Sequence, residues 1–211
     1  MAFPLLLTAI RLLIPFSILV WPLAGLLLSA TIDMYDWKFF PFSDEASYAL
    51  YQNWDKTLDF YYWLFALFIT FKWSEKTARL LAVGLFGWRI VGMVIFFLSQ
   101  WRPALFFFPN VFENFVLFYL AYAAVAKGRP LFTSWQIMAT VLLSIVVPKL
   151  VHEYFMHFLA KQPWEVYDVA SWLGLTTGTT HEYGNYVAWG LILHTVTISV
   201  LIFYVKKNQA K

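Results

Sequence analysis

Six apolar segments dominate the sequence, and each is long enough to cross a lipid bilayer as a helix. They cover roughly residues 12–32, 57–73, 79–100, 103–127, 134–160 and 186–205. A helix of about 20 mostly apolar residues spans the hydrocarbon core, where backbone groups have no water to bond with and must pair within the helix. The pattern therefore predicts an all-α integral membrane protein, a bundle of about six transmembrane helices.

The composition leaves little sequence for anything else. Hydrophobic residues make up 61% of the 211 residues and charged residues 13%, whereas a soluble domain is about half apolar and a quarter charged. We therefore expect one polytopic domain over residues 1–211, located in the cell membrane. The absence of cysteine excludes thiolate catalysis and zinc-thiolate sites in this sequence. The basic balance is interpreted as membrane topology, so lipid is the expected partner and nucleic acid is not.

Basic residues gather in the segments that connect the apolar stretches on one predicted face. That face carries nine cations and the single acid Glu75: Arg11, Lys72, Lys76, Arg79, Lys127, Arg129, Lys206, Lys207 and Lys211. The opposite face carries four cations, Lys38, Lys56, Arg102 and Lys161. Because lysine and arginine in short loops favour the cytoplasmic side, we expect the nine-cation face, with both chain termini, to be cytoplasmic.

Four aspartates lie at the opposite, predicted extracytoplasmic face. Asp33 and Asp36 end the first apolar segment, and Asp55 and Asp59 flank the start of the second. Crowded carboxylates repel one another, and a divalent cation relieves the repulsion. The sequence predicts a metal site formed by these four aspartates, with Mg, Mn or Zn as the cofactor.

A second set of polar residues lies deeper in the predicted bundle. Residues 149–157 carry one polar stripe within an arc of roughly 140° of a helix, and residues 110–114 repeat the spacing after Pro109. Arg89, Glu113 and Lys149 fall roughly 15 to 16 Å from the extracytoplasmic ends of their helices at 1.5 Å per residue. The predicted catalytic residues are His152, Glu153 and His157, and the predicted substrate-binding residues are Arg89, Lys149, Asn110, Glu113 and Asn114.

Polar groups confined to one half of the bundle favour a binding site over a conduit. The main hypothesis is a metal-assisted enzyme acting on a lipid or lipid-linked substrate at the extracytoplasmic leaflet, with a histidine moving a proton. In that hypothesis Arg89, Lys149 and Arg102 neutralise a phosphate headgroup. The alternatives are a structural or assembly subunit, whose charges hold helices together or to other membrane subunits, and an ion- or proton-coupled transporter.

The aspartate spacing also resembles a known family motif. Asp33-x2-Asp36 and Asp55-x3-Asp59 resemble the metal-binding motif of the CDP-alcohol phosphatidyltransferases, six-helix enzymes that transfer a phosphoalcohol between lipids with a divalent ion. The resemblance covers about 27 residues, and the family's two glycines and its Ala-Arg pair are absent here. It implies a metal-dependent lipid transferase that works at the cytoplasmic face, opposite to the face predicted above.

Overall fold

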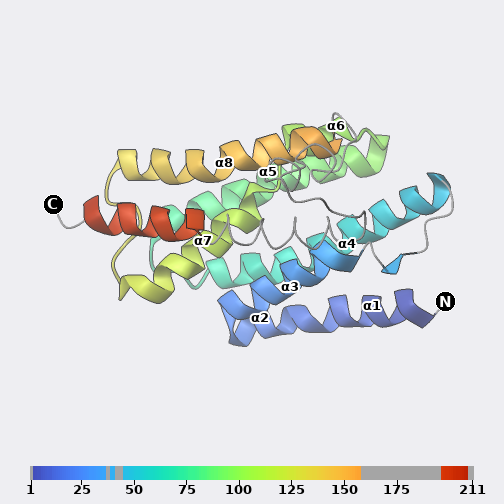
Figure 1. Cartoon of the computed structure of the whole chain (residues 1–211), viewed down its shortest axis with the longest axis horizontal. Coiled ribbons are helices and arrows are strands. Elements are labelled where there is room, and N and C mark those ends of the chain that lie inside the picture. Colours follow the sequence, from blue (N-terminus) through green and yellow to red (C-terminus); the bar gives the residue numbers. More distant parts are fainter. Residues whose placement is uncertain (1, 37–38, 41–44, 158–195, 209–211) are drawn as a thin grey trace, which may run out of the picture.

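The structure, a computed structural model, describes residues 2–36, 39–40, 45–157 and 196–208, and all of the regular elements among them are helical (Figure 1). The elements are α1 (Ala2–Leu13), the 3-10 helix η1 (Ile14–Phe16), α2 (Ser17–Val20), α3 (Pro22–Asp36), α4 (Glu45–Thr70), α5 (Lys76–Ser99), α6 (Pro103–Phe107), α7 (Val111–Ala126) and α8 (Trp135–His157), followed by a helix over 196–208. The prediction of an all-helical fold is confirmed for these residues.

Three helical units are long and apolar enough to cross a membrane. They are Lys76–Ser99 (α5), Pro103–Ala126 (α6 with α7) and Trp135–Tyr154 within α8. They match the predicted spans 79–100, 103–127 and 134–160, so the chain is a candidate membrane protein by length and composition. The predicted span 57–73 lies largely within α4, whose first half carries charged residues, and the predicted span 186–205 falls partly outside the described residues.

The first predicted span, residues 12–32, is not one helix. The chain runs helically from α1 through η1 to α2, turns at Trp21, and returns as α3 beside the first arm (Figure 1). Trp21 has φ −127° and ψ 76°, outside the helical region, because the ring of the following proline disfavours helical geometry in the residue before it. The single span 12–32 is therefore wrong, and a helical hairpin takes its place.

This hairpin adds one more reversal of the chain and changes where the chain ends lie. In Figure 1, α1 begins at the end of the bundle where α4 starts, and the helix 196–208 finishes at the other end. The expectation that both termini share one face is therefore not supported. Arg11, which the sequence analysis placed with the basic residues, lies instead in the arm that packs on α3 and α4.

Gly25 lets the two arms of the hairpin touch. A β-carbon added at Gly25 would lie 2.6 Å from the carbonyl carbon of Ser17 and would also collide with the backbone nitrogen of Ile18. Backbone atoms cannot rotate away as the end of a side chain can. Close packing of the hairpin therefore requires glycine at this position.

Gly25→Ala is expected to destabilise the protein by about 1 to 3 kcal/mol, because overpacking must push the two arms apart. The measurement is thermal unfolding of detergent-solubilised protein followed by circular dichroism. Gly84→Ala is the matched control, since a β-carbon at Gly84 on α5 meets nothing within 4 Å and alanine favours a helix by about 1 kcal/mol over glycine. Equal melting temperatures for the two variants would contradict the close contact.

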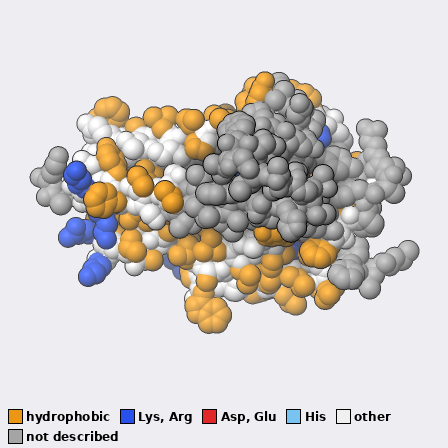
Figure 2. Space-filling view, viewed as in Figure 1, with side chains coloured by type: hydrophobic (Ala, Val, Ile, Leu, Met, Phe, Trp, Pro, Cys, Tyr) orange, Lys and Arg blue, Asp and Glu red, His pale blue; other side chains and the backbone are white. Residues whose placement is uncertain are grey.

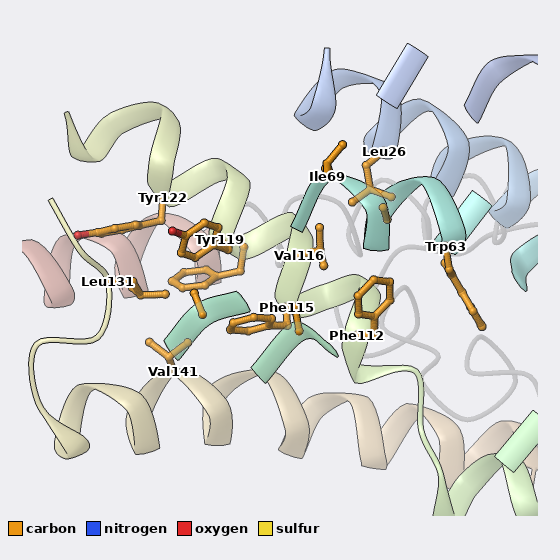
Figure 3. Close-up of a cluster of buried hydrophobic side chains, with 14 of the residues drawn as sticks. Leu26, Trp63, Ile69, Phe112, Phe115, Val116, Tyr119, Tyr122, Leu131 and Val141 are labelled. Atoms are coloured by element: carbon orange, nitrogen blue, oxygen red, sulfur yellow. The ribbon is translucent and has the colours of Figure 1, made fainter. Parts of the chain in front are cut away.

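Apolar side chains from several helices form the core of the described bundle. One cluster of almost completely buried side chains joins three helices: it includes Leu26 of α3, Trp63 of α4, and Phe112, Phe115 and Val116 of α7 (Figure 3). Outside this core, many large apolar side chains are exposed, including Trp135, Leu143, Val147 and Val151 of α8. Such exposure is unusual for a soluble protein but suits helices that face lipid tails.

The two ends of the bundle differ in charge. Lysine and arginine side chains gather at the end where α4 joins α5 and α7 joins α8 (Figure 2). Glu75, the one acid predicted there, accepts hydrogen bonds from the backbone N–H groups of Leu131 (2.8 Å) and Phe132 (2.7 Å). Glu75 therefore links the α4–α5 connection to the α7–α8 connection, and its role is structural. The acidic cluster described next lies nearer the opposite end.

Candidate metal centre

The four predicted aspartates come together where α3 ends and α4 passes beside it. Asp33 and Asp36 lie in the last turns of α3, and Asp55 and Asp59 lie one turn apart on α4. Those spacings, i to i+3 and i to i+4, place each pair on one face of its helix. Asp36, Asp55 and Asp59 are buried, whereas the side chain of Asp33 keeps 26% of its surface exposed.

Arg11 lies at the centre of this cluster and binds all four carboxylates. Its Nη1 donates to Asp36 and to Asp55 Oδ1 (3.0 Å), and its Nη2 donates to Asp33 Oδ1 (2.7 Å) and Asp59 Oδ1 (2.8 Å). Only 4% of the residue is exposed. A planar guanidinium carries five donors in a fixed fork, so a single arginine can bridge several carboxylates.

Lys56 and Tyr51 complete the cluster from α4. The Lys56 ammonium contacts Asp55 Oδ2 (2.7 Å) and Asp59 Oδ2 (2.8 Å), and the Tyr51 hydroxyl donates to Asp36 Oδ1 (2.7 Å). Four carboxylates therefore face two cations, which leaves two formal negative charges when all four acids are ionised.

Burial changes the acidity of the two aspartates on α3. Removal from water raises the pKa of Asp36 to about 7, and the nearby Arg11 opposes this rise without cancelling it. The pKa of Asp33 is also raised well above its usual range, first by burial and then by the charge of Asp59. Both shifts arise because a carboxylate loses hydration in a crowded anionic site. Both carboxyl groups therefore hold a proton more tightly in the folded protein than they would in water.

Three of the four aspartates have the spacing of metal ligands. Asp33, Asp55 and Asp59 each offer a carboxylate oxygen, and these oxygens all lie within 4.8 Å of one another. An all-carboxylate ligand set suits Mg²⁺ or Mn²⁺, which prefer oxygen ligands, better than Zn²⁺, which usually takes nitrogen or sulfur. Among the described residues, neither Asp36 nor a histidine belongs to this group.

A second polar layer begins one turn further along α4. Glu113 Oε2 accepts from the Tyr62 hydroxyl (2.7 Å), from Trp63 Nε1 (3.2 Å) and from Asn110 Nδ2 (2.7 Å). Asn110 also caps α7 by accepting from the backbone N–H of Glu113. Tyr62 follows Asp59 by three residues on the same helix, so Glu113 and Asn110 lie close to the aspartates. Asn114, one residue further on, is half-buried.

Arg89 of α5 borders this layer without an acidic partner among the described residues. Its Nη1 donates to the backbone carbonyls of Leu105 (3.2 Å) and Phe108 (2.7 Å), and its guanidinium lies 5.6 Å from the centre of the Trp63 ring. Its Nε is buried and has no hydrogen-bond partner in the part of the chain that the structure describes. Arg89 and Glu113, both predicted to bind substrate, do not pair in the described structure: Arg89 bonds to backbone carbonyls, and Glu113 bonds to uncharged donors.

The predicted catalytic residues lie on α8, away from the aspartates. Lys149 and Glu153 form an ion pair (3.0 Å) along one face of the helix, and α8 packs against α6 and α7. His152 is half-buried, and His157 is the last residue of α8, with a side chain outside the described ones. The expected meeting of His152 with the aspartates is not seen in the described cluster. For His157 that meeting stays a prediction.

Sequence reasoning missed Arg11 as a site residue. It assumed that residues 12–32 form one straight span, which placed Arg11 at the face opposite to the aspartates. The dipeptide Trp21-Pro22, followed by Gly25, is the signal that would have indicated a turn inside this apolar segment. Tyr51 was also missed, because a lone tyrosine ahead of a predicted span carries no motif.

Comparison of the chain with protein-family models, with curated proteins and with solved structures finds no match in any of the three.

Proposed function

We propose that the protein is a metal-assisted enzyme that acts on a lipid or lipid-linked substrate at the extracytoplasmic leaflet. The observation that carries this proposal is the charge imbalance of the buried cluster, in which four carboxylates face only Arg11 and Lys56. When all four carboxylates are ionised, one divalent cation at Asp33, Asp55 and Asp59 would bring the formal charge to zero. Removing charge in this way is favourable because buried, uncompensated charge is costly.

The position of the cluster supports a lipid substrate. The side chain of Asp33 is partly exposed, and it belongs to the last turns of α3, which runs away from the basic connections (Figure 1). If the basic end is cytoplasmic, as the distribution of lysine and arginine favours, the cluster opens toward the other leaflet. Lipid headgroups reach such a position without leaving the membrane.

The residues around the metal ligands provide the remaining chemistry. A bound Mg²⁺ or Mn²⁺ supplies Lewis acidity toward a phosphoryl or carbonyl oxygen. Asp36 has a pKa of about 7 and receives a hydrogen bond from Tyr51, so it can exchange a proton near neutral pH. This residue takes over, in our proposal, the proton-transfer role that the sequence analysis gave to His152 and Glu153. Lys56 holds Asp55 and Asp59 in place.

One observation favours a second function, that of a structural or assembly subunit. Arg11 bonds to all four carboxylates without any added ion, so the cluster joins α1, α3 and α4 by itself. In that case the aspartates stabilise the bundle and bind no metal. The two functions predict different responses to added metal: the enzyme requires the metal for its activity, whereas the structural subunit binds none.

The test is lipid turnover by purified protein in phospholipid vesicles, with products read by mass spectrometry. We expect conversion of a lipid that requires Mg²⁺ or Mn²⁺ and is lost in Asp59→Asn. Lys76→Gln, an exposed change on α5 at the basic end, should leave the conversion intact. Vesicle lipids that are identical with metal and with chelator would count against the enzyme and favour the structural subunit.

A further inference from the structure

Arg89 is a buried cation whose hydrogen-bonding capacity is only partly used. It is 2% exposed, and only its Nη1 donates to carbonyl oxygens in the described structure. Its Nε is buried without a partner, and no ion pair joins it to an acid of the described residues. A buried charged donor without a hydrogen bond costs free energy, because the lost hydration must be compensated by another partner.

A purely structural role accounts for only part of this arrangement. Two carbonyls at the end of α6 accept from Arg89, and a cation stabilises the C-terminus of a helix. One nitrogen of the guanidinium is enough for that contact. Among the described residues the guanidinium meets the Trp63 ring but no acid, and Nε meets no acceptor; an anion is the partner that would satisfy both.

Arg89 also lies close to the proposed metal centre. Its guanidinium packs over Trp63, and Trp63 follows Asp59 on α4 by four residues, a rise of about 6 Å along the helix. Arg89 is therefore a second positive centre beside the polar layer that adjoins the aspartates.

We propose that Arg89 is the anion-binding residue of the substrate site, and that the substrate is a phosphate-bearing lipid. This inference rests on the proposed function for the reaction, whereas phosphate binding itself needs only the guanidinium. Arginine binds phosphate through paired N–H donors, and Nε is one of the donors available at Arg89. The metal ligands and Arg89 then hold one phosphate group from two sides, which orients it and withdraws negative charge from it.

The test is binding of dioleoylphosphatidate to the purified protein in neutral detergent with chelator present, measured by native mass spectrometry. Dioleoylglycerol has the same tails without the phosphate, and we expect it to bind at least about tenfold more weakly. Arg89→Gln should lose at least about tenfold in phosphatidate affinity, since charge-assisted hydrogen bonds are lost. Lys76→Gln removes a positive charge from the same helix at an exposed position and should bind as the wild type does.

Two further experiments extend this test. Arg89→Lys keeps the charge but loses the planar fork, so it should bind with an intermediate affinity and serves if Arg89→Gln fails to fold. If millimolar inorganic phosphate competes with phosphatidate, the free anion is sufficient for binding. If inorganic phosphate does not compete, binding requires the phosphate of a lipid. Both results place the anion at Arg89 if the variants behave as expected. Equal binding of phosphatidate and diacylglycerol, or equal losses in Arg89→Gln and Lys76→Gln, would overturn the inference. Because no metal is present, these results are independent of whether the aspartates bind one.

Discussion

Arg11→Gln is expected to lower the stability of the protein more than any other single substitution at the cluster. The change removes the guanidinium that bonds to Asp33, Asp36, Asp55 and Asp59 and leaves four carboxylates facing Lys56 alone. Breaking a buried ion pair by removing one partner costs about 3 to 5 kcal/mol, and here one partner serves four acids. The melting temperature in detergent, with chelator present, measures the loss.

Three companion variants distinguish this explanation from a general loss of charge. Lys76→Gln, which removes an exposed lysine, should leave the melting temperature nearly unchanged. Arg11→Lys should recover only part of the loss, because an ammonium group cannot reach four carboxylates at once. Adding Asp59→Asn to Arg11→Gln should restore some stability, since it removes one of the stranded charges. A double variant no more stable than Arg11→Gln would argue against repulsion within the cluster.

The second large effect is a dependence of stability on pH in the absence of metal. Burial raises the pKa of Asp36 to about 7 in the folded protein, whereas an unfolded chain leaves it near its usual value of about 3.9. The folded state therefore binds a proton more tightly than the unfolded state. This stabilisation is fully present below pH 3.9 and is lost as the pH rises through 7. In chelator, the melting temperature should fall between pH 6 and pH 8.

The groups that face Asp36 determine how large this effect is. Arg11 and Tyr51 favour the ionised form, and Asp55 and Asp59 disfavour it. Each unit of pKa shift corresponds to at most about 1.4 kcal/mol. Asp36→Asn should flatten the profile between pH 6 and pH 8, because asparagine does not titrate. A wild-type melting temperature that stays constant over this interval, or a profile that Asp36→Asn leaves unchanged, would show that Asp36 does not titrate there in the folded protein.

The apolar segments could be predicted from the sequence because length and composition alone decide them. The segments 79–100, 103–127 and 134–160 differ by a few residues from the units that the structure shows. The segment 12–32 could not be predicted in the same way, because the mean hydropathy of a segment does not reveal a turn between two apolar helices. Only the local effect of Pro22 on Trp21, together with the close contact at Gly25, reverses the chain there.

The candidate site, too, could be predicted from the sequence only in part. The clustering of Asp33, Asp36, Asp55 and Asp59 followed from helix ends that must lie at one face, and the structure brings them together. Arg11 could not be assigned to this cluster, because its position depends on the hairpin and on side-chain reach across three helices. The periodicity of polar residues along a helix predicts which face of that helix is polar, but not which other helix packs against that face. For this reason the stripe on α8 was expected to face the aspartates, yet α8 packs on α6 and α7.

Direct titration of the purified protein with Mn²⁺, followed by electron paramagnetic resonance, tests the central claim that the aspartate cluster binds a divalent cation. We expect one bound Mn²⁺ per chain that Mg²⁺ displaces, and loss of this binding in both Asp55→Asn and Asp59→Asn. Glu153→Gln removes a buried carboxylate that pairs with Lys149 on α8 and should retain the bound ion. If the wild type binds no Mn²⁺ at pH 8, or if Asp55→Asn and Asp59→Asn bind it as tightly as the wild type, the cluster is an ion network closed by Arg11 and Lys56 and is not a metal centre.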